Sequence, residues 1–192
     1  MNWGKLGIGS VMSNEELYEE ADKYYNNQEY KKAFHLFLKL AKDDDDTVAK
    51  DMLSYMYHAG EGVKKSREKR KFWLKKSSQC GSYYADHWLA CLYFEENKIK
   101  RGLTLLEENI EDDYIESIVF LAGCYYHGEY VLKDEEKAMF LYEKASSLGD
   151  KESAKYLVSM YNMKYGSRRK SFIPLVKSFY RMYKYNKNKE KK

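Results

Sequence analysis

The 192-residue sequence contains little proline, glycine or cysteine. One proline and 11 glycines are too few for a proline-rich linker, a collagen-like chain or a small loop-dominated fold. The three cysteines, Cys80, Cys91 and Cys124, are odd in number and lack disulfide-like spacing, which favours a reducing compartment. No run approaches the ~18 apolar residues of a membrane span, and the first 11 residues are too glycine-rich for a signal peptide. We therefore expect a cytoplasmic protein.

Aromatic and charged residues are abundant. Aromatic residues make up 16% of the chain, including 20 tyrosines, and charged residues make up 33%. The aromatic residues can supply a core that a disordered chain of similar charge lacks. The composition predicts one soluble and almost wholly helical domain.

The net charge of +4 conceals a basic C-terminal end. Residues 164–192 hold 11 basic residues against one acidic residue, Glu190, which is a net charge of +10. The residues before them therefore carry −6. We single out six cations of this end, which are Arg168, Arg169, Lys170, Lys177, Arg181 and Lys184.

Internal similarity organises the chain. The segment from Ala49 to Gly81 matches the segment from Ser117 to Gly149 at an offset of 68 residues. Further starts at Ala85 and Ser153 give spacings of 36, 32 and 36 residues. The shared positions are Ala49, Leu53, Tyr57 and Gly60 in one unit and Ser117, Leu121, Tyr125 and Gly128 in the other.

Each unit has the pattern of two helices joined by a turn. Apolar residues at i, i+4 and i+8 lie on one face of the first helix. Gly60 and Gly62 permit the left-handed backbone of the turn, and Ser66 and Asp134 are predicted N-caps of the second helix. Because one pair cannot bury its apolar face alone, the units are expected to stack.

These residues resemble the Sel-one-like repeat family, a relative of the tetratricopeptide family. The family pattern is A-x-x-x-L-G-x-x-Y-x-x-G-x-G-V, followed by D-x-x-x-A-x-x-W/Y and A-A-x-x-G. The Ala49 unit departs from it at Ser54, Ser66, Arg70, Ser77 and Ser78, and the Ser117 unit has Tyr130 in place of a glycine. The resemblance implies an all-α, right-handed α/α solenoid of about four to five helix-turn-helix repeats with a C-terminal capping helix.

Four segments are expected. Residues 1–12 form a flexible leader, residues 13–170 the repeat solenoid, residues 171–186 the capping helix and residues 187–192 a basic disordered tail. A capping box, Ser13-x-x-Glu16, opens the first helix. Pro174 suits the first turn of the capping helix, whose apolar stripe is Phe172, Leu175, Phe179 and Tyr183.

No recognisable catalytic or metal-binding motif is present. Cys124-x-x-His127 supplies two ligands where a closed zinc site needs four, and Cys124 also suits a core position. The sequence has no phosphate-binding glycine loop or serine nucleophile motif. We expect no enzyme activity, no cofactor, no metal and no small-molecule substrate.

The first helices of stacked repeats offer a groove for a partner. Alignment of the units places His58, Phe94, Tyr126 and Asn162 in one column, and Asp51, His87, Val119 and Lys155 in another. Amphipathic rings suit a protein interface, although some of these side chains would instead pack under the next helix. The candidate groove residues are Tyr55, His58, His87, Phe94, Ile118, Val119 and Tyr126.

The family resemblance implies a non-enzymatic protein-interaction adaptor. One specific version is a dedicated binder, such as a bacterial immunity protein that neutralises a toxin or effector. The alternative is a binder of nucleic acid or of an anionic membrane surface through the basic C-terminal helix and tail. The same tail could also be a solvated end, or contact an acidic region of the protein partner.

Overall fold

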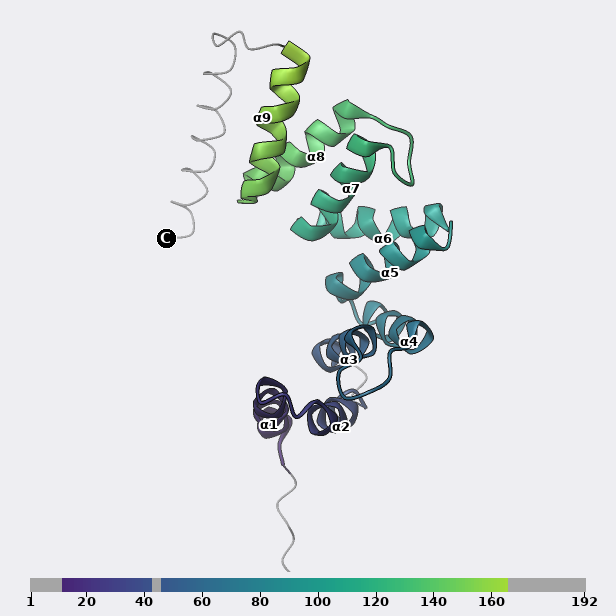
Figure 1. Cartoon of the computed structure of the whole chain (residues 1–192), viewed down its shortest axis with the longest axis vertical. Coiled ribbons are helices and arrows are strands. Elements are labelled where there is room, and N and C mark those ends of the chain that lie inside the picture. Colours follow the sequence, from purple (N-terminus) through teal and green to yellow (C-terminus); the bar gives the residue numbers. More distant parts are fainter. Residues whose placement is uncertain (1–11, 43–45, 166–192) are drawn as a thin grey trace, which may run out of the picture. The chain divides into compact units, whose positions relative to one another are not determined.

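The computed structural model describes residues 12–42 and 46–165. Within these ranges the chain forms nine helices and no strand, which confirms the predicted all-α architecture (Figure 1). The helices are α1 (Asn14–Asn26), α2 (Tyr30–Leu40), α3 (Thr47–Ala59), α4 (Arg67–Ser78), α5 (Tyr83–Glu95), α6 (Ile99–Glu111), α7 (Ile115–His127), α8 (Glu135–Ser147) and α9 (Lys151–Tyr165).

Helices that follow one another in the chain pack together. The most extensive contacts join α1 with α2, α3 with α4, and α7 with α8, so each of these is a helix pair of one repeat. Further contacts join α2 with α3, α6 with α7, and α8 with α9. This pattern of neighbour contacts is typical of a helical-repeat protein.

The predicted N-caps are confirmed. The Ser66 hydroxyl accepts a hydrogen bond from the backbone N–H of Lys69, and the Asp134 carboxylate accepts one from Lys137. Ser13 and Glu16 form a complete capping box at the start of α1. Each cap satisfies a helix-terminal N–H group that has no partner inside the helix.

The two clearest repeats end their first helix in the same way. Gly60 closes α3 with a φ of 80°, and Gly128 closes α7 with a φ of 73°. The backbone N–H of each glycine donates to a carbonyl of the last turn, that of Met56 and that of Cys124 respectively. The left-handed conformation then turns the chain toward the second helix.

The chain divides into two compact units, Met1–Ala85 and Asp86–Lys192, with the boundary inside α5. Unit 1 has a core of eleven buried residues from α1 to α3, and Trp73 of α4 packs against it. Unit 2 has its own core from α5 to α9, in which Leu106, Ile118, Ala122 and Ala138 are fully buried.

The predicted end segments remain predictions. Met12 is exposed, and the rest of the leader lies outside the described residues. The capping helix over residues 171–186 and the tail over residues 187–192 also lie outside them.

Candidate functional site

Two of the predicted groove residues are exposed in unit 1. Tyr55 and His58 lie one turn apart on α3, and 38% of Tyr55 is exposed to solvent. The opposite side of α3 carries Leu53 and Met56, which are fully buried. The amphipathic spacing of α3 thus leaves Tyr55 and His58 available to a partner.

Tyr55 belongs to a group that we call the tyrosine cluster, formed by Tyr25 of α1, Tyr55 of α3 and Tyr84 of α5. The Tyr25 hydroxyl donates a hydrogen bond to Oε2 of Glu61 at 2.5 Å. Burial raises the pKa of Tyr25 above its ordinary value, and the nearby Glu61 and Tyr55 raise it further. The Tyr25 hydroxyl therefore remains protonated at neutral pH and can donate its hydrogen bond to Glu61.

The third tyrosine lies beside a polar contact that positions the start of α5. Oγ of Ser82 donates to Oδ2 of Asp51 at 2.6 Å and accepts from the backbone N–H of Ala85 at 3.1 Å. Burial raises the pKa of Tyr84, and the neighbouring Asp51 carboxylate raises it further. Burial also raises the pKa of Asp51.

His58 is held by a residue of the second helix in its repeat. Nδ1 of His58 lies 3.1 Å from Nη1 of Arg70, a residue of α4. A guanidinium can only donate, so His58 accepts this hydrogen bond at Nδ1. The contact orients the imidazole at the C-terminal end of α3.

Sequence reasoning missed Tyr25, Tyr84, Glu61 and Arg70 as members of this site. Tyr25 and Tyr84 lie outside the aligned repeat columns, and they meet Tyr55 only because α1, α3 and α5 pack as they do. Arg70 could have been identified from the sequence as a candidate site residue, because it occupies a position where the family pattern has alanine.

The structure places three predicted groove residues in the interior of unit 2. His87, Phe94 and Ile118 are 8%, 2% and 0% exposed. Phe94 is stacked against Phe120 and Tyr130, at ring-centroid distances of 5.9 and 5.2 Å. These side chains therefore contribute to packing, as the alternative considered from the sequence allowed.

His87 is the centre of a buried polar network. Its Nδ1 lies 3.2 Å from the Ser117 hydroxyl, which also accepts a hydrogen bond of 2.9 Å from Nδ2 of Asn109. The network joins α5, α6 and α7. Burial lowers the pKa of His87 from its ordinary value, although the carboxylate of Glu116 opposes the effect.

Val119 and Tyr126 are half-buried on one side of α7. The Tyr126 ring meets the Tyr156 ring edge-on at 6.4 Å, and Tyr156 stacks on Tyr142 at 5.0 Å. Tyr156 is 42% exposed. Unit 2 thus presents a second aromatic surface, formed by Tyr126 of α7 and Tyr156 of α9. The six cations selected between Arg168 and Lys184 lie outside the described residues.

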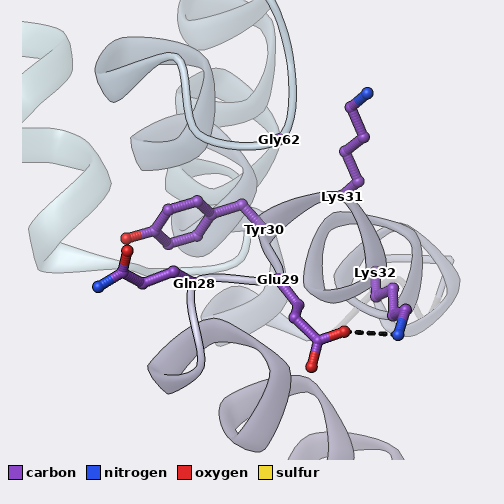
Figure 2. Close-up of a pocket in the computed structure, with 6 residues that line it drawn as sticks. All are labelled: Gln28, Glu29, Tyr30, Lys31, Lys32 and Gly62. Atoms are coloured by element: carbon purple, nitrogen blue, oxygen red, sulfur yellow. Dashed lines mark hydrogen bonds and ion pairs between the residues drawn. The ribbon is translucent and has the colours of Figure 1, made fainter.

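An open pocket of about 420 Å³ lies in unit 1, where the turn before α2 meets the turn after α3 (Figure 2). It is lined by Gln28, Glu29, Tyr30, Lys31, Lys32 and Gly62. In Figure 2 the Tyr30 ring lies beneath the Gly62 turn, Glu29 pairs with Lys32, and Lys31 points away from them. The lining contains neither a cysteine nor a histidine nor a pair of carboxylates.

Across the described ranges, no three or more His, Cys, Asp or Glu side chains are placed to hold a metal ion. Burial raises the pKa of Cys124 to about 12, so its thiol is protonated in the core.

No helix among residues 12–42 and 46–165 is long and apolar enough to cross a membrane.

Comparison with known proteins agrees with this geometry. The family model described as the Sel1 repeat matches residues 27–45, 48–82 and 115–150. These ranges cover α2, α3 with α4, and α7 with α8. A search of curated protein sequences finds no match.

Two solved structures share the fold. A Sel1 repeat protein from Oxalobacter formigenes is 23% identical, with a TM-score of 0.67 over 77% of this chain. A protective antigen of uropathogenic Escherichia coli strains, with an SLR fold, is 23% identical with a TM-score of 0.68 over 82% of this chain. The chain spans 62% and 35% of the lengths of these two proteins.

The predicted helical-repeat solenoid is thereby confirmed. Proteins with Sel1 repeats generally mediate protein–protein interactions and are generally non-catalytic scaffolds. The three matched segments and the repeat turns at Gly60 and Gly128 lead to one conclusion: the chain contains three Sel1 repeats.

Proposed function

We propose that this protein is a non-enzymatic adaptor that binds a protein or peptide through the tyrosine cluster of unit 1. The observation that carries the proposal is the exposed ring of Tyr55, flanked by Tyr25 and Tyr84 and by the polar groups of Glu61 and Arg70. Tyrosine and arginine are enriched among the residues that dominate binding energy at protein interfaces.

The chemistry of the cluster indicates the kind of partner. Each tyrosine offers an apolar ring and a hydroxyl, which together suit a segment with both apolar and hydrogen-bonding groups. The ordering cost is low because Tyr25 and His58 are already held by Glu61 and Arg70. A dedicated binder, such as a bacterial immunity protein that neutralises a toxin, is the most specific form of this proposal.

The first experiment identifies the partner by affinity capture from native lysate and mass spectrometry, and then measures its affinity by calorimetry. We expect Tyr55→Ala to weaken binding about tenfold, since truncation at an interface hot spot typically costs more than ~1 kcal/mol. His58→Ala is expected to weaken it by a smaller factor.

Phe140→Ala is the matched control, because Phe140 is 67% exposed on α8 in unit 2. It removes an exposed ring outside the cluster and is expected to leave the affinity unchanged. Full affinity in a Tyr55→Ala, His58→Ala double variant would show that the cluster is not the binding surface.

A further inference from the structure

Helix α4, the second helix of the repeat that starts at Ala49, is rich in basic residues, as is the loop before it. From Lys64 to Lys76 the chain has one acidic residue, Glu68, and eight basic residues. The basic residues are Lys64, Lys65, Arg67, Lys69, Arg70, Lys71, Lys75 and Lys76. This run of 13 residues alone carries more positive charge than the net +4 of the whole chain.

The cations of α4 surround an exposed aromatic ring. Lys69, Phe72, Lys75 and Lys76 follow helical spacing, and all four are exposed. Leu74 and Ser77 face the other way and are fully buried. Phe72 is 51% exposed, so α4 presents an apolar side chain among lysines rather than a uniformly polar surface.

Helix α2 has a similar exposed stripe. Lys31, His35, Leu38 and Lys39 are all exposed, and Leu38 is 36% exposed. The helix contains no acidic residue. The turn that leads from α3 into α4 comes close to the start of α2, where Gly62 lies against the backbone of Tyr30, and Figure 1 shows α2 and α4 on the same side of their partners α1 and α3.

Several of these lysines form no ion pair within the described part of the chain. Lys39, Lys65, Lys75 and Lys76 form no ion pair with any residue in 12–42 or 46–165. Lys69 lies over the Tyr57 ring at 5.3 Å, a contact that leaves its charge at the surface. These ammonium groups are therefore available to an external anion.

We propose that this basic face, formed by the exposed sides of α2 and α4, docks the protein on an anionic lipid bilayer. Lysines near such a surface are attracted to its negative headgroups, and Phe72 and Leu38 can enter the boundary with the acyl chains. Binding of this kind is peripheral. None of its exposed side chains named above belongs to the tyrosine cluster.

The residue types favour a bilayer over nucleic acid or an acidic protein. Nine of the eleven cations in α2, α4 and the loop before α4 are lysines, whereas bidentate recognition of phosphate groups favours arginine. A phosphate backbone offers nothing to Leu38 or Phe72. A bilayer takes both kinds of side chain and requires no matching pocket from a partner.

The test measures co-sedimentation of the full chain with vesicles of phosphatidylcholine, with and without about one third phosphatidylglycerol. We expect binding only to the anionic vesicles, with an affinity that falls as salt is added. Lys75→Glu with Lys76→Glu should lower that affinity by at least about thirtyfold. Lys100→Glu with Arg101→Glu, which reverses two exposed cations on α6, should change it less than about twofold and serves as the control.

A second variant separates the apolar contribution. Phe72→Ser should weaken binding to anionic vesicles while the salt dependence stays the same, since no charge is removed. Equal losses in the α4 and α6 double variants would overturn the proposal, because binding would then follow net charge alone. Equal binding to both vesicle types, or binding to single-stranded RNA without binding to vesicles, would also overturn it.

Discussion

Left-handed backbone positions show how single residues determine the turns between helices. Gly62 has a φ of 73°, and a Cβ atom at this position would lie 2.4 Å from the carbonyl oxygen of Tyr30. Tyr130 occupies the equivalent position in a later repeat and keeps a φ of 64°. Its backbone strain, about 1–2 kcal/mol, is offset by stacking of its ring on Phe94 at 5.2 Å. The same turn therefore requires glycine only where another backbone approaches closely.

Two glycine substitutions separate these effects. Gly81 has a φ of 84° and nothing within 4 Å of an added Cβ, so Gly81→Ala should cost only the backbone strain of about 1–2 kcal/mol. Gly62→Ala should cost about 2 kcal/mol more, since it must also displace the Tyr30 backbone. Urea denaturation of both variants gives the two values, and equal costs would contradict the steric argument.

At the scale of helices, unit 2 depends on close packing between α5 and α6. A Cβ atom at Gly102 of α6 would lie 2.4 Å from the Phe94 ring and 3.1 Å from the Ala90 carbonyl. That ring cannot move easily, because Phe120 and Tyr130 stack against it. Glycine at this position lowers intrinsic helix stability but allows the two helices to approach.

Alanine at the two helical glycines of unit 2 should have opposite effects. Gly102→Ala should destabilise the protein by about 1–3 kcal/mol through overpacking. Gly123→Ala on α7 should stabilise it by about 0.5–1 kcal/mol, since an added Cβ there meets only the Tyr142 hydroxyl at 3.8 Å. Thermal or urea unfolding measures both changes. Stabilisation by Gly102→Ala would show that the helices can separate at little cost.

The network that joins α5, α6 and α7 should make stability depend on pH. Burial lowers the pKa of His87 below 6.5, so below that pH the unfolded chain binds a proton that folded His87 does not. The folded state therefore loses stability as the pH falls below 6.5, by at most about 1.4 kcal/mol per pH unit from this group. Above 6.5 the effect disappears.

Urea denaturation at pH 8 and pH 5.5 tests this linkage. We expect His87→Gln to lose less stability between the two pH values than the unsubstituted protein does. His127→Gln, a change at an exposed histidine on α7, is the control and should leave the pH dependence as it was. The same pH dependence in all three proteins would exclude His87 as its source.

At the scale of the whole molecule, each helix contacts mainly its neighbours in the chain. Stability in such a protein is approximately a sum of repeat and interface contributions, so a local defect need not unfold every repeat. Leu53 in the core of unit 1 and Leu157 in the core of unit 2 allow this property to be measured.

Leu53→Ala should cost about 2–5 kcal/mol and raise amide hydrogen exchange most in α2, α3 and α4. Leu157→Ala is the reciprocal control and should raise exchange most in α8 and α9. Mass spectrometry of peptic peptides resolves the helices. A uniform rise along the chain in either variant would indicate that all repeats unfold in one step.

Short-range features of the fold could be predicted from the sequence. The capping residues Ser66 and Asp134 and the turn at Gly60 follow from the spacing of a few residues, because caps and turns are made within one stretch of chain. The repeat spacing likewise predicts helix pairs. The candidate site was predicted only in part, since spacing identifies one side of a helix but not what covers it.

The sequence by itself determined the helices, their caps and the need for repeats to stack, because these depend on local backbone preferences and on periodic apolar residues. Only the tertiary structure decided which aromatic side chains remain exposed. Tyr55 stays at the surface, whereas Phe94 is enclosed by Phe120 and Tyr130. Burial is a property of neighbours from other helices, and contacts such as Tyr25 with Glu61 and Arg70 with His58 exist only after those helices have packed.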